Sequence, residues 1–185
     1  KGIYDAMNIG IKNSSGKYIG FCNSGDVLKK NSLKTITRFL KKDIDVLFTT
    51  VKRNYTGEYI IKSGYNLNRL KYNFDFATSH STGFYIKKKF HNKIGLYDLS
   101  FKCSADYDFY LRVFKLKNLK IMNTDHNNII GEVQSGGFSS TLTPIQHLKE
   151  ETKIRFKNKQ NILLIALIYS NALIKILLKT LFKKT

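Results

Sequence analysis

The apolar and polar positions along the first fifty residues predict an α/β order. Apolar residues recur at four-residue steps over 3–13, which is the spacing of one helix face. Two short apolar runs, at 17–22 and 45–51, are rich in β-forming residues and predict strands, and a helix is predicted between them at 33–42. Helix, strand, helix, strand is typical of an α/β domain with a largely parallel sheet.

The rest of the chain is less regular, although its helical signals are clear. A strand is predicted at 82–87, a short helix at 88–94 and a longer amphipathic helix at 105–117. Thr143 followed by Pro144 is a typical start of a helix, which should run to about residue 158. A last helix of more apolar character is predicted over 162–182, and weaker signals predict strands at 58–61, 119–122 and 128–133, a short helix at 67–72 and a flexible loop at 135–140.

Composition limits the class of protein. The chain has 185 residues and is 42% hydrophobic, which fits one cored domain with or without an appendage. It has two cysteines, Cys22 and Cys103, and neither belongs to a CxxC pair or lies beside histidines at metal-ligand spacing. A disulfide-stapled scaffold and a structural zinc site are therefore excluded.

The charge is strongly basic, with 32 lysines and arginines against 13 acids and a formal net charge of +19. Lysine predominates and is scattered, as an AT-rich genome would produce without selection for a polyanionic partner. An anionic membrane surface and a nucleic acid are the two alternatives. Because the chain has neither an arginine-rich stripe nor a nucleic-acid-reading motif, we expect no nucleic-acid partner.

Two short acidic segments could carry chemistry. Asn23, Ser24, Gly25 and Asp26 follow the first predicted strand, and ligands of open α/β sheets bind at the carboxyl ends of strands. A carboxylate at that position can hold a hard divalent cation, although the same four residue types also favour an ordinary turn.

The second segment begins the 105–117 helix, where Asp106 and Asp108 fall in the first turn. Both could simply stabilise the helix start, because the macrodipole favours negative charge there. A carboxylate fixed at a helix start can also act as a general base. Among the four histidines, His80 stands out only because it lies among serines and threonines.

These segments together resemble family 2 glycosyltransferases of bacterial polysaccharide clusters. Residues 2–11 (GIYDAMNIGI), 16–21 (GKYIGF) and 23–26 (NSGD) are similar to that family's "GIYDAMNKGI", "ATGEYI" and "NSGD". Further along, 94–98 (IGLYD), 105–112 (ADYDFYLR) and 136–140 (GGFSS) resemble its "GLFDE", "SDYDFFLR" and "GGVSS". The resemblance extends in order over about residues 2–155.

The resemblance implies a GT-A-like α/β fold that binds a nucleotide-sugar donor together with Mg²⁺ or Mn²⁺. It assigns Asp106 as catalytic base, Asp26 as metal ligand and His80 with Asp108 to the acceptor side. The donor-binding residues would be Asp5, Asn8, Asn23 and Ser24. An aspartate with the ordinary pKa of about 3.9 would be ionised at neutral pH and able to accept the acceptor's proton.

What the resemblance implies in full is an inverting glycosyltransferase for a glycan or lipid-linked acceptor in cell-surface polysaccharide synthesis. The family's first strand is missing ahead of the 2–11 segment, so residues 1–160 correspond to the C-terminal two-thirds of such a domain. We therefore expect an N-terminally truncated chain. The rival hypothesis is an inactive remnant that serves as a GT-A-like binding or scaffold module.

Residues 161–185 predict an apolar and basic C-terminal helix. The stretch 162–178 is mostly apolar and would extend roughly 26 Å at about 1.5 Å per residue, somewhat short for a membrane span. We expect it to lie at the inner membrane surface, with its lysines toward anionic headgroups, which would make the protein cytoplasmic and peripheral to the plasma membrane. Packing on the domain or on another subunit is the alternative.

Overall fold

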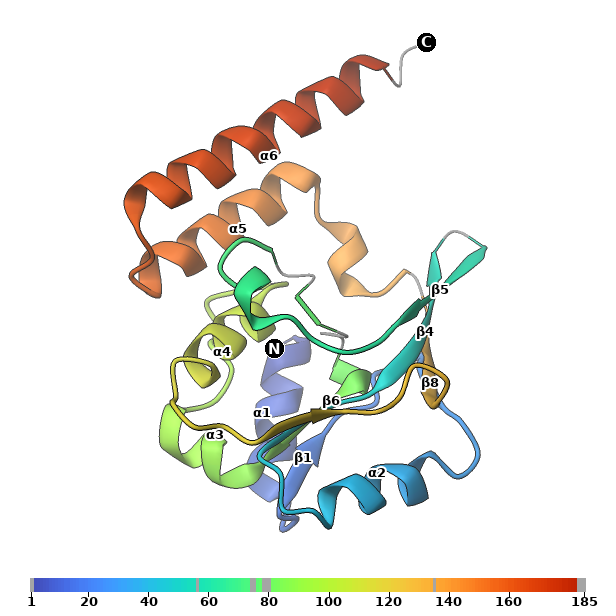
Figure 1. Ribbon diagram of the computed structural model, residues 1–185. Helices are drawn as coiled ribbons and strands as arrows, with labels where there is room; N and C mark the ends of the chain where they lie inside the picture. Colours follow the sequence, from blue (N-terminus) through green and yellow to red (C-terminus); the bar gives the residue numbers. More distant parts are fainter. Residues whose placement is uncertain (1, 56, 74–75, 78–80, 135, 183–185) are drawn as a thin grey trace.

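The computed structural model describes residues 2–55, 57–73, 76–77, 81–134 and 136–182. They form a mixed α/β fold with two four-stranded sheets and helices around them (Figure 1). The N-terminal half contains, in chain order, helices and strands α1 (Ile3–Asn13), β1 (Tyr18–Gly20), β2 (Val27–Leu28), α2 (Ser32–Leu40), β3 (Val46–Phe48), β4 (Thr50–Tyr55), β5 (Glu58–Lys62), the 3-10 helices η1 (Leu67–Arg69) and η2 (Ser81–Gly83), and β6 (Phe84–Lys87). The C-terminal half contains α3 (Lys88–Ile94), α4 (Ala105–Val113), β7 (Ile121–Asn123), β8 (Ile129–Val133), the 3-10 helix η3 (Phe138–Thr141), α5 (Pro144–Lys157) and α6 (Ile162–Phe182).

The first sheet has the order β1-β6-β3-β7. β6 is antiparallel to both of its neighbours and β7 is parallel to β3, so three of the four strands point the same way. The second sheet has the order β2-β8-β4-β5, with β4 parallel to β8 and antiparallel pairs at both ends. The expected α/β class is confirmed; the predicted strand at 45–51 divides at Thr49 between the two sheets.

Strand β3 shows how helices cover both faces of the first sheet. Its three residues are fully buried. Val46 and Phe48 pack into the larger core with α1, α3 and α4, whereas Leu47 turns to the opposite side, into the smaller core beneath α2. A strand buried on both faces is apolar throughout instead of alternating, which explains the continuous VLF sequence.

The C-terminal helices extend this body. α5 begins with a capping box, in which the Thr143 hydroxyl accepts from the backbone N–H of Gln146 and the Gln146 side chain accepts from the Thr143 N–H. Pro144 occupies the first helical position, where its missing N–H costs nothing. α5 packs against α4, and α6 lies over α5 on the side away from the sheets (Figure 1).

Candidate active site

The carboxyl ends of β1 and β3 meet at one edge of the first sheet. Gly20, the last residue of β1, pairs with Tyr85, and Phe48, the last residue of β3, pairs with Phe84. The 3-10 helix η2 immediately precedes β6, so it lies at the same edge. Because ligands of α/β sheets bind at the carboxyl ends of strands, this edge is where a site is expected.

Asp26 is held at this edge by hydrogen bonds to both of its oxygens. The Thr82 hydroxyl donates to Oδ2 at 2.5 Å, and the backbone N–H of Gln134 donates to Oδ1 at 3.2 Å. Three residues earlier, the Asn23 side-chain amide donates to the Ser81 hydroxyl at 2.6 Å. The 23–26 loop is thus fastened to η2 and to the end of β8, and the positive φ of 89° at Gly25 lets it turn there.

Asp106 lies in the first turn of α4 and is half-buried. Its Oδ1 accepts from the Tyr4 hydroxyl at 3.0 Å and from the backbone N–H of Tyr107 at 3.0 Å. The Tyr4 hydroxyl also lies 2.7 Å from the Cys103 carbonyl oxygen, so its one proton is shared between two acceptors. Helix α1 and the loop before α4 therefore fix the orientation of this carboxylate together.

Burial raises the pKa of Asp106 to about 7, and the hydrogen bond from Tyr4 opposes this rise without cancelling it. The nearby negative charge of Glu150 adds to the rise. The expectation of an ordinary, fully ionised aspartate is therefore changed: near neutral pH this carboxyl exchanges its proton readily. That is the property a general base or acid needs.

A short series of contacts links the two carboxylates. Thr82, which binds Asp26, is two residues from Phe84, and the ring of Phe84 packs edge-on against Tyr110 at 4.9 Å between centroids. Tyr110 is four residues after Asp106, so both project from the same face of α4. The strand that follows the Asp26 partner Thr82 is thus packed against α4, the helix that carries Asp106.

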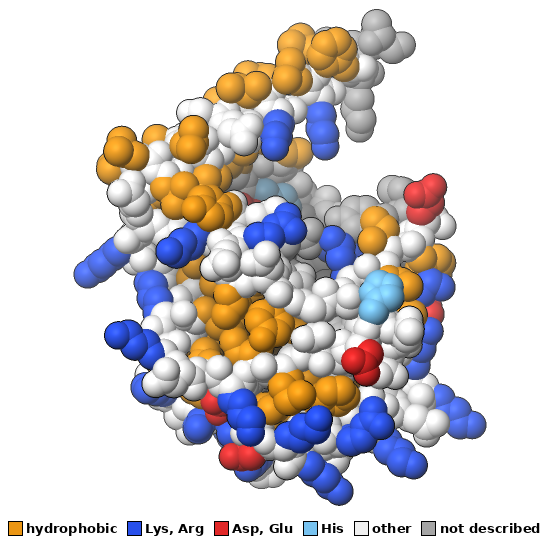
Figure 2. All heavy atoms as spheres, viewed as in Figure 1, with side chains coloured by type: hydrophobic (Ala, Val, Ile, Leu, Met, Phe, Trp, Pro, Cys, Tyr) orange, Lys and Arg blue, Asp and Glu red, His pale blue; other side chains and the backbone are white. Residues whose placement is uncertain are grey.

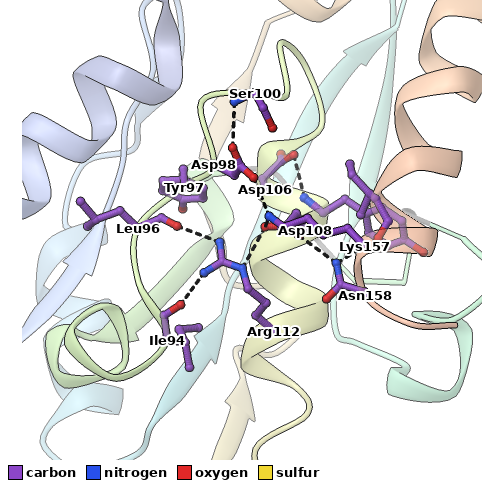
Figure 3. A network of polar contacts seen from close by, with 12 residues as sticks. Ile94, Leu96, Tyr97, Asp98, Ser100, Asp106, Asp108, Arg112, Lys157 and Asn158 are labelled. Atoms are coloured by element: carbon purple, nitrogen blue, oxygen red, sulfur yellow. Dashed lines mark hydrogen bonds and ion pairs between the residues drawn. The ribbon is translucent and has the colours of Figure 1, made fainter.

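Asp108 has different surroundings (Figure 3). Its carboxylate is fully buried, accepts from Arg112 Nε at 2.8 Å and from the Asn158 side-chain amide at 2.8 Å, and lies 3.3 Å from Lys157 Nζ. Arg112 continues to the backbone carbonyls of Ile94 and Leu96. These contacts join α4 to α5 and to the end of α3, so they favour a structural role over the acceptor contact that the resemblance implied.

The predicted donor residues divide into two groups. Asn8 is buried, and its amide makes paired 2.9 Å hydrogen bonds with the backbone C=O and N–H of Tyr97, so its side chain fastens α1 to the 95–98 loop. Asp5 is half-buried in the first turn of α1, and Ser24 is exposed in the 23–26 loop. His80 lies outside the described residues. Donor binding by Asp5, Asn8, Asn23 and Ser24 stays a prediction, with the amide of Asn8 already engaged by the Tyr97 backbone.

Sequence reasoning did not assign three residues that shape this edge: Tyr4, Thr82 and Glu150. Tyr4 lies inside the 2–11 segment. The feature that could have identified it is its hydroxyl group, a polar group on a helix face that is otherwise apolar. Thr82 follows the hydroxyl-rich 78–81 stretch. Glu150 on α5 accepts hydrogen bonds from the backbone N–H groups of Lys102 at 2.5 Å and of Cys103 at 2.9 Å. These two residues lie in the loop before α4, almost fifty positions earlier, so only the fold brings them together with Glu150.

The mixed sheets with helices around them, together with the match to solved structures reported below, define an α/β domain of the GT-A-like class. The model of the family "Glycosyl transferase family 2" matches residues 1–106, and the chain belongs to this family. The family expected from the sequence is thereby confirmed.

Similar proteins support both the family and the fold. A "PGL/p-HBAD biosynthesis glycosyltransferase" of Mycobacterium tuberculosis is 27% identical over 152 residues, which cover 80% of this chain and 57% of that protein. An uncharacterized glycosyltransferase of Rickettsia prowazekii is 24% identical over 160 residues, covering 80% and 49%. The crystal structure of S. aureus TarS 1-349 in complex with UDP-GlcNAc matches with a TM-score of 0.60 and 17% identity, covering 93% of this chain and 52% of that one. The chain thus spans about half the length of the curated relatives it matches.

Proposed function

We propose that the protein is an inverting glycosyltransferase that moves a sugar from a nucleotide-sugar donor to a hydroxyl group of its acceptor. The observation that carries the proposal is Asp106, a half-buried carboxylate with a pKa raised to about 7, oriented by Tyr4 in the first turn of α4. Membership of the family supports the reaction class.

In the proposed reaction Asp106 is the general base. Its carboxylate takes the proton from the acceptor hydroxyl while that oxygen bonds to the anomeric carbon, and the bond from this carbon to the donor's diphosphate breaks. The attack comes from the face opposite the leaving group, so a single displacement inverts the anomeric configuration. Because its pKa is near 7, Asp106 is a stronger base than an ordinary aspartate, and a large fraction of it is still ionised at neutral pH.

The donor would bind beside the 23–26 loop. Support comes from the position of this loop at the carboxyl ends of the strands and from the UDP-GlcNAc complex of the structurally similar TarS. Asp5 on α1 and Asn23 with Ser24 on the loop are the residues we propose for contact with the nucleotide or the sugar.

Mg²⁺ or Mn²⁺ is part of the proposal, with Asp26 as its protein ligand. Among the residues that the structure describes, no group of three or more histidine, cysteine or acidic side chains could enclose a metal. One carboxylate fits a cation of the magnesium type, which binds through one or two carboxylates, substrate phosphates and water. When bound, such an ion would neutralise charge on the leaving diphosphate. Thr82 and the Gln134 N–H orient Asp26 for this role.

The acceptor we propose is a glycan or a lipid-linked sugar of a cell-surface polysaccharide, with His80 on the acceptor side. The name of the mycobacterial relatives, which refers to PGL/p-HBAD biosynthesis, is in keeping with a cell-envelope acceptor. Nucleic acid is not part of the proposal.

We further propose a cytoplasmic enzyme bound to the inner face of the plasma membrane through α6. Within the described ranges, α6 is the one helix long and apolar enough to cross a membrane. However, Ile165 is buried, and Leu164 and Ile168 are half-buried where α6 packs along α5. A helix with one side on its own domain and the other side apolar and exposed is suited to lie in the plane of the membrane interface.

A donor screen would test the proposed reaction. The purified full-length protein is incubated with UDP- and other nucleotide-linked sugars, with Mn²⁺, Mg²⁺ or EDTA, and nucleoside diphosphate release and the anomeric configuration of the product are measured. We expect transfer with inversion that EDTA abolishes and that Asp26→Ala and Asp106→Asn each reduce. Donor binding without transfer under all conditions would instead support the inactive binding module.

A further inference from the structure

A pocket of about 400 Å³ lies at the corner where α5 turns into α6. Its walls come from the segment around η1, the end of α4, and the turn between the two C-terminal helices. Five of its lining residues are apolar and none is acidic. The apolar residues are Leu67, Leu70, Leu111, Phe114 and Leu164.

Arg155 gives this corner a fixed shape. Its guanidinium is buried and donates to the backbone carbonyl oxygens of Lys71 and Tyr72, which ties the turn after η1 to α5. The pocket is therefore bounded by backbone held in place from within the fold, and not by loosely packed side chains alone.

Three lysines line the same pocket. Lys115 is held at 2.9 Å by the Asn158 carbonyl oxygen and at 3.1 Å by its side-chain oxygen, and burial lowers the pKa of its amine. Lys71 and Lys159 are exposed, and neither amine has an ion pair within the described part of the chain. The lining of the pocket thus combines five apolar side chains with two exposed positive charges.

The surface beside the pocket is apolar. Leu163 and Leu167 on the first turns of α6 are 77% and 68% exposed, and Phe156 on α5 is 54% exposed. Hydrophobic side chains also extend along α6 in the view of Figure 2. After Glu151 the sequence contains no acidic residue and eight basic ones: Lys153, Arg155, Lys157, Lys159, Lys175, Lys179, Lys183 and Lys184.

We propose that this pocket binds an anionic phospholipid of the membrane, with the headgroup phosphate between Lys71 and Lys159 and the upper part of an acyl chain against the leucines. The inference deepens the proposed membrane contact and does not depend on sugar transfer. Free phosphate would leave the apolar walls of the pocket exposed to water, and a neutral lipid would leave the lysines without a counter-charge. An anionic lipid covers the apolar walls and also neutralises the lysines.

Vesicle binding tests the pocket directly. The protein is sedimented with vesicles of phosphatidylcholine alone or with vesicles that contain about 30% phosphatidylglycerol, whose anionic headgroups give the surface a negative potential. We expect binding to the anionic vesicles, reduced about ten-fold or more in the double variant Lys71→Glu and Lys159→Glu. The matched control changes Lys30 and Lys34 to glutamate; both are exposed near the start of α2, on the side of the molecule opposite α6 (Figure 1).

The control variant should keep most of the anionic binding, because it changes the net charge equally but leaves the pocket intact. If both double variants lose anionic-vesicle binding equally, binding depends on net charge alone, and the proposed lipid pocket is wrong. Equal binding to both kinds of vesicle would overturn its anionic specificity. Matching thermal unfolding of all three proteins would show that the substitutions leave the fold intact.

A short-chain, water-soluble lipid distinguishes binding of a phospholipid headgroup from binding of free inorganic phosphate. Dihexanoyl phosphatidylglycerol below its micelle concentration should raise the unfolding temperature of the wild type and not that of the Lys71 and Lys159 variant. An equal rise with inorganic phosphate at the same concentration would overturn the lipid. Transfer to a water-soluble acceptor should be unchanged in the pocket variant, so a failure here leaves the proposed transferase reaction untouched.

Discussion

Asp106 and Asp108 stand two residues apart in the first turn of α4, and their surroundings are opposite. Asp108 is enclosed in the protein with Arg112, Lys157 and Asn158 on its oxygens. Asp106 is half-buried and receives hydrogen bonds from a tyrosine hydroxyl and one backbone N–H.

This difference separates a structural carboxylate from a reactive one. A buried carboxylate whose oxygens are occupied by cations and amides ties helices together, so it has little capacity left for a substrate. A partly desolvated carboxylate without a cation has a raised pKa and can take up and release a proton near neutrality. The same residue type in the same helical turn can therefore serve either purpose, and the cations supplied from α4 and α5 decide which.

The largest effect is expected from Asp106→Asn. General-base catalysis contributes typically 10²–10⁴-fold, so the rate of sugar transfer should fall by about that factor. The amide is nearly isosteric with the protonated carboxyl, so below about pH 4, where the carboxyl is protonated in both the folded and the unfolded chain, the free energy of unfolding should change little. Initial transfer rates together with urea unfolding check this, and an unaltered rate would remove Asp106 from the mechanism.

Asp108→Ala should destabilise the fold, because it leaves the half-buried Arg112 without its counter-charge and removes an acceptor from the buried Asn158 amide. Breaking a buried ion pair from one side costs about 3–5 kcal/mol, which urea denaturation can measure. The folded fraction should keep its transfer rate. Lost transfer at unchanged stability would place Asp108 on the acceptor side after all, as the sequence resemblance implies.

The pH dependence of stability should carry a contribution from Asp106. Folded Asp106 keeps its proton up to about pH 7, whereas in the unfolded chain an aspartate loses it near pH 4. The folded state therefore holds more protons in this interval, and this contribution to the free energy of unfolding is lost as pH rises from about 4 to about 7. Subtracting the profile of Asp106→Asn isolates it, and a flat difference would contradict the raised pKa.

The smallest expected effects are opposite shifts of the acidic limb of the kcat/KM profile. Tyr4→Phe removes a hydrogen bond that favours the carboxylate form of Asp106. Its pKa should therefore rise, and the acidic limb of the kcat/KM profile should move to higher pH. Glu150→Gln removes a nearby negative charge, so both should move to lower pH. Each shift should be at most about one pH unit, because one such interaction is worth about 1 kcal/mol. Reduced rates without a shift in either variant would mean that both residues are only structural.

Local patterns predicted most of the elements. The 3–13 helix has the expected bounds, the 88–94 helix ends before Gly95, and the Thr143 cap with Pro144 begins α5 as expected. The missed elements depend on tertiary pairing. The two-residue strand β2 exists because it pairs with β8, and the 45–51 run divides because its halves join different sheets.

The site was predictable only in part, for a related reason. The 23–26 loop and the start of α4 could be selected from residue types at element ends. Whether an acid meets a cation from a distant helix cannot be read from its neighbours in sequence. Lys157 and Asn158, which bind Asp108, come from residues about fifty positions later.

The contact of Glu150 with the Lys102 and Cys103 backbone bears on where this protein can be cut. The stretch that matches the family model ends at residue 106, in the first turn of α4. The loop before α4 contains Cys103, whose carbonyl oxygen accepts from the same Tyr4 hydroxyl as Asp106 does. This loop is nevertheless held by Glu150 of α5, more than forty residues further along the chain. An expression boundary chosen from the family match would remove that anchor together with most of α4. A shortened version intended for crystallisation or screening should therefore retain the chain at least through the end of α5.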